Sequence, residues 1–289
     1  MTGPTDMRET TALEMAPSAP PPSTAGGVVR LVRRRPLVSF FVLSCLLAWW
    51  PAALYATGVW PEPIVGFGPF LAAVVVLGAT KGRAGIRALL RSMVSWRVPG
   101  RAYVLAIGLP LLLTGVPVLA NLGFGADASA EALGAWTAIP LTALVVLLIP
   151  GLGGAWEEPG FRGFALPRLE QRLGALVGPL VLGVLWVVWH GPLFITGQIL
   201  WTDVLVVVAA SVIIALVFHT ARESVLLAMI FHATNNAVGG QYASQLFHGA
   251  DLTRLGFLTA LTWWLVAAAV LVIVRRRTVQ EAQDIRVTA

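Results

Sequence analysis

Glu157-Glu158-Pro159-Gly160-Phe161-Arg162 interrupts a chain that is otherwise built from long apolar runs. Its first two residues are the only adjacent carboxylates within this apolar sequence. A charged side chain at membrane depth is costly, so a carboxylate there usually has a function and a partner. The candidate partners are Arg162, His190, His232 and Asn236. The remaining sequence predicts a membrane frame that holds these groups.

The composition predicts an integral membrane protein. Hydrophobic residues make up 57% of the 289-residue chain, charged residues only 12%, and the mean hydropathy is +0.80. The net charge of +6 could suggest nucleic-acid binding, but the basic residues lie at the ends of apolar runs. That placement is a topology signal of membrane proteins, so no nucleic-acid partner is expected. The single cysteine, Cys45, excludes an intrachain disulfide and a cysteine-based metal site.

Three parts of the chain are distinguished by composition. Residues 1–30 are polar and rich in Pro, Ala, Ser and Thr, which predicts a disordered tail. A transmembrane domain is predicted over residues 31–277, and a short cytoplasmic tail over 278–289. The first apolar run begins only at Leu37 and is long enough to span, so we expect a retained helix rather than a cleaved signal peptide.

The predicted fold is an all-α, polytopic membrane helix bundle of about eight transmembrane helices. Open strands cannot span lipid, and each apolar run approaches the ~20 residues that a spanning helix needs. The predicted spans are residues 37–58, 64–80, 102–121, 138–156, 174–195, 201–218, 224–242 and 255–274.

The distribution of charge predicts that both termini are cytoplasmic. With that topology, 19 of the 20 basic residues lie on the cytoplasmic side, and only Arg254 lies outside. A count of seven or nine spans would break this pattern. The basic linker 81–101 is predicted to be a cytoplasmic loop held at the anionic leaflet, with a specific lipid site as the alternative.

The acid pair is predicted to have two different environments. Glu158 and Arg162 are four residues apart, so on a helix they can form an ion pair on one face. Glu157 points about 100° away and is left for another partner. Pro159 fits the first turn of a helix beginning near Trp156, which would place both carboxylates at its positive end. The alternative is that both acids merely mark the cytoplasmic end of the fourth span.

Two of the four histidines are candidates for the same site. His219 and His248 fall near predicted helix ends and are expected to be interfacial, whereas His190 and His232 lie within apolar runs. A lone histidine in such a helix is usually a packing residue, but two of them beside an acid pair favour a site. Asn236 follows His232 by four residues, so one helix face presents an imidazole and an amide. Together these groups could orient a water or donate to an oxyanion.

Three ordered motifs resemble those of the CPBP family, also called the ABI family. Its members are intramembrane proteases related to the type II CAAX prenyl endopeptidase. The motifs lie within about residues 140–240 and are Glu157-Glu158-x-x-x-Arg162, Trp186-x-x-x-His190 and His232-x-x-x-Asn236. Each motif is weak alone, but three in order are specific. Trp186 stands where the family usually has Phe, and it keeps an aromatic wall.

The resemblance implies an intramembrane endopeptidase with Glu157 as the general base that activates water. His190 would position or polarise that water, and Asn236 is a candidate oxyanion donor. The implied site comprises catalytic Glu157, His190, His232 and Asn236, with Glu158 and Arg162 as the supporting ion pair. Members of the family have been described both as metalloproteases and as glutamate-dependent enzymes without a firmly bound metal.

Both mechanisms stay open at this point. If a metal is bound, Glu157, His190 and His232 have the ligand types of a catalytic zinc site. The same residues match a metal-free base and its orienting partners equally well.

The resemblance also implies a partner and a place. The substrate would be a membrane-tethered protein or peptide, cut near the lipid bilayer, at a cell-membrane site that opens to the cytoplasm. The motifs look like the bacterial branch, so a prenylated CAAX substrate is not expected. Two other classes are a non-catalytic membrane scaffold or bacteriocin-immunity factor on the same fold, and a transporter with a proton relay. The sequence makes no prediction of the oligomeric state.

The predicted spans do not bring the site together by themselves. His190 lies ~24 Å along its predicted helix and His232 only ~12 Å along its own, whereas Glu157 lies near an inner end. We therefore expect the acid pair to be embedded, with residues 162–172 at or in the inner leaflet.

Overall fold

The computed structural model describes residues 24–288, and that part of the chain is all helical, without strands. Seven of its helical segments are long and apolar enough to cross a membrane, which suggests a multi-pass membrane protein. They are Pro36–Ala56, Gly68–Ser92, Gly100–Gly123, Ala130–Leu148, Gly154–Trp189, Asp203–Thr220 and Gly249–Gln280. The predicted all-α membrane bundle is confirmed, and the orientation of the termini stays a prediction.

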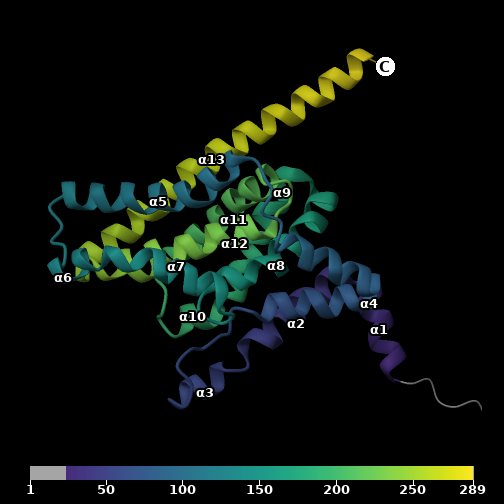
Figure 1. Ribbon diagram of the computed structural model, residues 1–289, viewed down its shortest axis with the longest axis horizontal. Helices are drawn as coiled ribbons and strands as arrows, with labels where there is room; N and C mark the ends of the chain where they lie inside the picture. Colours follow the sequence, from purple (N-terminus) through teal and green to yellow (C-terminus); the bar gives the residue numbers. More distant parts are fainter. Residues whose placement is uncertain (1–23, 289) are drawn as a thin grey trace, which may run out of the picture.

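Individual helices subdivide these segments (Figure 1). The first half contains α1 (Thr24–Arg34), α2 (Pro36–Trp49), α3 (Ala52–Ala56), α4 (Gly68–Ser92), α5 (Gly100–Gly123), α6 (Ala130–Gly134), the 3-10 turn η1 (Ala135–Ala138) and α7 (Ile139–Leu148). The second half contains the 3-10 turn η2 (Gly154–Glu157), α8 (Glu158–Gly160), the π-helical turn η3 (Phe161–Ala165), α9 (Leu166–Trp189), α10 (Gly191–Ile195), α11 (Asp203–Thr220), α12 (Val225–Asn235), the π-helical turn η4 (Asn236–Tyr242), the 3-10 turn η5 (Ala243–Gln245) and α13 (Gly249–Thr288).

Helix α12 lies in the middle of the bundle, where it contacts α5, α7, α11 and the η2–α8 segment (Figure 1). It corresponds to the predicted span 224–242, and the chain stays helical through η4. Yet it is not among the seven segments, because its second half is polar. Most of its side chains are covered by protein, so polar groups can be satisfied there without facing lipid. Seven segments of the described residues thus have the length and hydropathy of a span, and the eighth predicted span, 224–242, is present as a helix that is more polar and mostly covered by protein.

Helix α9 and the segment before it also differ from the prediction. The run predicted as a span over 138–156 breaks, because α7 ends at Leu148 and a loop leads to a new helical segment at Gly154. Helix α9 consists of two helical parts that meet at Gly174, where the backbone is not helical, with φ of 82°, a conformation that glycine adopts readily. The part after Gly174 begins where the predicted span 174–195 begins, but it ends at Trp189. The acid pair thus starts a helix instead of ending the fourth span.

The other differences concern the ends of helices. Helix α4 is interrupted at the non-helical Gly82, close to the end of the predicted span 64–80, and the basic linker predicted as a loop over 81–101 is helical from there as far as Ser92. Helix α1 overlaps the end of the tail predicted to be disordered, and residues 1–23 lie outside the described part. Helix α13 continues past residue 277 and leaves the bundle (Figure 1).

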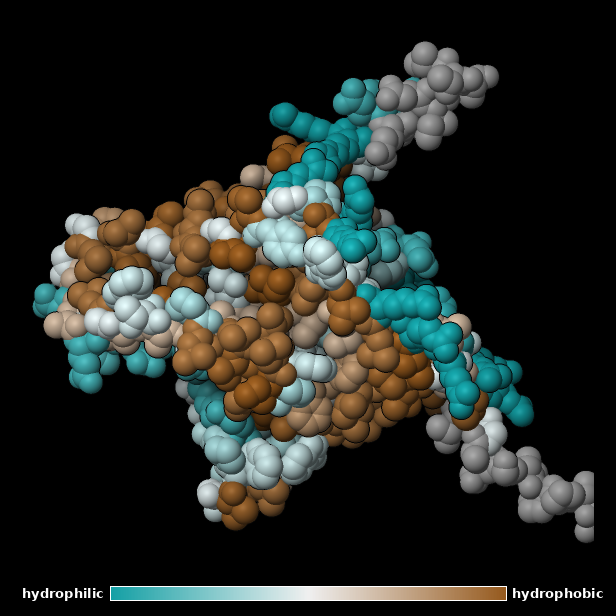
Figure 2. Space-filling model, viewed as in Figure 1, coloured by the Kyte–Doolittle hydropathy of each residue, from teal (hydrophilic) through white to brown (hydrophobic). Residues whose placement is uncertain are grey.

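Hydrophobic residues cover the middle of the visible surface, and hydrophilic residues gather along the outer part of α13 and near α4 (Figure 2).

Candidate active site

The acid pair lies inside the protein. Glu157 is 4% exposed, and Glu158 and Arg162 are fully buried. Pro159 occupies the first turn of the helix that begins here, as predicted. The pair is thus covered by protein on all sides, and its depth in a membrane stays a prediction.

Glu158 accepts two hydrogen bonds at one oxygen. The Arg162 Nη1 donates to Glu158 Oε1 over 3.0 Å, which confirms the predicted ion pair on one helix face. His232, from the central helix α12, places its Nδ1 2.6 Å from the same oxygen. A carboxylate can only accept, so we assign the proton of this contact to Nδ1. The His232 Nε2 is then directed away from Glu158.

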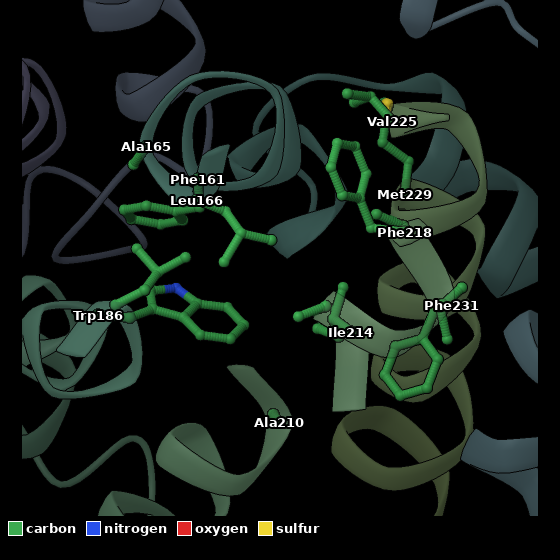
Figure 3. Close-up of a cluster of buried hydrophobic side chains, with 14 of the residues drawn as sticks. Phe161, Ala165, Leu166, Trp186, Ala210, Ile214, Phe218, Val225, Met229 and Phe231 are labelled. Atoms are coloured by element: carbon green, nitrogen blue, oxygen red, sulfur yellow. The ribbon is translucent and has the colours of Figure 1, made fainter. Parts of the chain in front are cut away.

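Glu157 has a separate partner, as its position on the helix predicts. Its Oε2 accepts a hydrogen bond of 2.7 Å from the indole Nε1 of Trp186. The same indole lies under the Arg162 guanidinium, whose carbon is 4.3 Å from the ring centroid. It also packs beside Phe161, with 5.7 Å between ring centroids (Figure 3). One buried tryptophan therefore orients the carboxylate and covers the cation of the neighbouring ion pair.

The two halves of the site meet at Gly154. A Cβ atom built on this glycine would overlap His232 Nε2 and would lie 2.8 Å from Glu157 Oε1. The second oxygen of Glu157 and the second ring nitrogen of His232 therefore both lie against this glycine. Only glycine fits here, because any side chain would displace both groups.

Asn236 lies beside Gly153, the residue directly before Gly154. It is the first residue of the π-helical turn η4, and its Nδ2 is 3.1 Å from the position of a Cβ on Gly153. A second π-helical turn, η3, follows the acid pair and carries Arg162. Such turns widen a helix locally and are frequent at functional sites. Here the two turns occur in the two segments that contribute most of the polar groups.

His190 joins the site indirectly. It lies at the end of α9, and its Nδ1 is 2.8 Å from the backbone oxygen of Trp186. The Trp186 ring lies 5.4 Å from the His190 ring and 5.5 Å from the His232 ring. Among the described residues, no hydrogen bond links His190 directly to Glu157 or His232. Trp186 is therefore the contact shared by the two histidines.

The predicted three-ligand metal set is not assembled in the described part of the chain. No three His, Cys, Asp or Glu side chains gather there as a metal site. Glu157 and His232 converge on Gly154, whereas His190 is turned toward the Trp186 carbonyl. The groups that do converge at Gly153 and Gly154 are a carboxylate, an imidazole and an amide.

Two contributions were missed by sequence reasoning. The sequence interpretation gives Trp186 only the role of an aromatic wall, although tryptophan carries an N–H that phenylalanine lacks and can orient a carboxylate. Gly154 received no role, although it lies in the glycine-rich run 151–154 directly before the acid pair. The run was a signal for close approach of other groups to the backbone.

A comparison with known families finds a match over the part of the chain that contains the candidate site. Residues 135–238 match the family model described as Type II CAAX prenyl endopeptidase Rce1-like. The matched range contains all six predicted site residues and agrees with the extent of the predicted resemblance, about 140–240. No curated protein matches the chain.

Proposed function

We propose that this chain, whose residues 135–238 match the Rce1-like type II CAAX prenyl endopeptidase family model, hydrolyses a peptide bond of a membrane-tethered protein or peptide. The domain implies a peptidase and a protein substrate. The observation that carries the proposal further is the meeting of Glu157 Oε1 and His232 Nε2 at Gly154, inside an apolar bundle. A carboxylate and an imidazole in this arrangement can activate a water molecule.

In the proposed first step, Glu157 is the general base. A water donates one hydrogen bond to Glu157 Oε1 and the other to the neutral His232 Nε2, so its lone pair is directed at the substrate carbonyl. Glu157 takes the proton while the oxygen forms a bond to the carbonyl carbon. Glu158 holds His232 in the required tautomer through Nδ1, and Arg162 balances the charge of Glu158.

The second step releases the products. The tetrahedral oxyanion accepts a hydrogen bond from the Asn236 amide, whose Nδ2 lies beside Gly153. The bond between the carbonyl carbon and the nitrogen then breaks, and Glu157 returns its proton to the leaving amine. The immediate products are a carboxylic acid and an amine, and Glu157 is again ionised. The new carboxylic acid then gives its remaining proton to the amine, which leaves a carboxylate and an ammonium group. In this scheme His190 is a positioning residue that acts through Trp186.

The proposal is tested by incubating the purified, detergent-solubilised protein with a peptide library while its metal content is measured. Cleavage that survives chelators supports the glutamate mechanism. If the protein contains a stoichiometric metal and cleavage stops when a chelator removes it, the result instead supports the predicted zinc alternative. A protein that binds but never cuts a membrane-tethered substrate is the scaffold or immunity factor. Flux of a solute into vesicles without cleavage identifies a transporter.

Replacing Trp186 with phenylalanine is expected to lower kcat more than it changes KM. The variant keeps an aromatic ring beside Phe161 but loses the N–H that orients Glu157. A hydrogen bond to a charged group contributes about 1.5–3 kcal/mol, so kcat should fall roughly 10- to 100-fold. The matched control is Trp49→Phe, which loses an indole hydrogen bond to the Trp189 carbonyl on another helix. Equal kcat values for the two variants would contradict the role of the indole.

Replacing Gly154 with alanine is expected to remove activity without unfolding the protein. The new methyl group would overlap His232 Nε2 and crowd Glu157 Oε1, so both atoms would have to move from their present positions. Misplacement of catalytic groups by about 1 Å can cost roughly 10²-fold in rate. The control is Gly108→Ala on α5, where the nearest atom is 4.0 Å from the new Cβ. Activity of both variants at the wild-type level would place the reacting atoms elsewhere.

A further inference from the structure

A second polar cluster lies apart from the catalytic groups, in a pocket between α9, α11 and α13. We call it the α9–α11–α13 pocket, and its volume is about 210 Å³. It lies near the end of α11 and beside the part of α13 that leaves the bundle (Figure 1). Arg101 and Arg277 contribute to its polar side, together with Glu170 and His219. None of these residues has a role in the proposed reaction.

The kink of α9 builds this pocket. After the non-helical Gly174 the helix turns so sharply that Glu170 packs against Gly178. A Cβ on Gly178 would be only 2.9 Å from the Glu170 backbone nitrogen. From this position the Glu170 Oε1 lies 2.9 Å from His219 Nε2 on α11. The kink therefore joins α9 to α11 at the surface and leaves a hollow beside Ala175.

The lining has two chemically different parts. Buried apolar side chains from three helices form the floor, among them Pro179, Val212 and Val270. The exposed guanidinium groups of Arg101 and Arg277 lie at the rim. Among the side chains that the structure describes, neither arginine forms an ion pair. Arginine binds phosphate with a planar pair of donors, so this rim suits a phosphate group.

We propose that the α9–α11–α13 pocket binds an anionic phospholipid. Its phosphate lies between Arg101 and Arg277, and an acyl chain lies on the apolar floor. Basic pockets between transmembrane helices on the cytoplasmic side are known forms of acidic-lipid sites, and the charge distribution predicts this end to be cytoplasmic. The apolar floor favours a lipid over a free phosphate, which would contact only the rim. The Glu170–His219 contact engages the one carboxylate of the pocket.

The lipid site takes no part in the proposed peptidase reaction, but one helix, α9, contributes residues to both sites. Helix α9 runs from the pocket to Trp186, which orients Glu157. A lipid bound beside the kink would contact α9, α11 and α13 together and would stabilise their packing. The inference concerns binding alone and can be tested without any substrate.

The test is native mass spectrometry of the full chain released from nanodiscs that contain phosphatidylcholine with a minor fraction of phosphatidylglycerol. We expect wild type to retain one phosphatidylglycerol in preference to phosphatidylcholine. Arg101→Gln with Arg277→Gln should lower the affinity for phosphatidylglycerol roughly 10- to 30-fold. The control, Arg87→Gln with Arg91→Gln, removes the same charge from exposed positions of α4 and should retain the lipid as wild type does.

A second variant tests the apolar part of the site. Ala175→Phe fills the pocket from its exposed edge, keeps the charge unchanged and should also reduce retention of phosphatidylglycerol. Equal retention by the two double arginine variants would overturn the proposal. Displacement of phosphatidylglycerol by inorganic phosphate, with no effect of Ala175→Phe, would identify a site for a free anion and would also overturn it.

Discussion

Replacement of Glu157 by glutamine is expected to lower kcat by roughly 10²–10⁴-fold, the usual contribution of a general base. Glutamine has nearly the same shape, and its amide oxygen can still accept the hydrogen bond from Trp186. It cannot take a proton from water, so the substrate should still bind and KM should change little. The measurement is a comparison of kcat and KM for a cleaved peptide, made with wild type and variant of equal thermal stability.

The matched control for this variant is Glu131→Gln. Glu131 is an exposed carboxylate in the short helix α6, so the change in charge is the same but the site is untouched. We expect this control to cleave at the wild-type rate. If Glu157→Gln and Glu131→Gln had equal kcat values, Glu157 would not be the base.

The largest expected effect on stability comes from Arg162→Met. Arg162 is fully buried, pairs with Glu158 over 3.0 Å and lies over the Trp186 ring. Its removal leaves the buried carboxylate of Glu158 without its cation, and breaking a buried ion pair in this way costs about 3–5 kcal/mol. The free energy of unfolding, measured by denaturant titration in a defined detergent, should fall by this amount.

Two further variants separate the ion pair from simple loss of an arginine. Arg172→Met changes an exposed residue of α9 and should leave the free energy of unfolding close to that of wild type. Glu158→Gln with Arg162→Met removes both charges and should be more stable than Arg162→Met alone. A double variant less stable than the single one would show that Arg162 contributes by packing and not by pairing.

Much of the fold follows from the apolar runs, but their limits do not. A run of apolar residues predicts a helix, yet it cannot reveal that 138–156 contains the end of α7, a loop and a new helix. The break depends on Gly151 and Gly153, both with positive φ, and on packing against other helices. The predicted span 224–242 is helical, but the sequence does not reveal that α5, α7 and α11 surround this helix, because that is a tertiary property.

The candidate site was predictable where residues are close in sequence. The four-residue spacings predict that Glu158 pairs with Arg162 and that His232 and Asn236 share a helix face. The contact of His232 with Glu158 joins residues 74 positions apart, so only the tertiary structure reveals it. The bond between Trp186 and Glu157 is likewise a tertiary contact, although the N–H of tryptophan was visible in the sequence.

Each buried charge of the site has at least one partner, although Glu158 Oε2 and the Nε and Nη2 of Arg162 have no hydrogen bond among the described residues. Arg162 and His232 share Glu158 Oε1, and Trp186 satisfies one oxygen of Glu157. The other oxygen of Glu157 and the Nε2 of His232 remain available at Gly154. The frame therefore holds one carboxylate rigidly paired and leaves its neighbour able to react.

The central claim is that water activated by Glu157 cleaves a peptide bond. The most direct measurement is mass spectrometry of the products formed in heavy-oxygen water, with the protein reconstituted in liposomes that carry membrane-tethered peptides. The account predicts that wild type forms a new C-terminal carboxylate with one heavy oxygen and that Glu157→Gln forms almost none. Equal product from both proteins, or cleavage by wild type without incorporation of solvent oxygen, would contradict it.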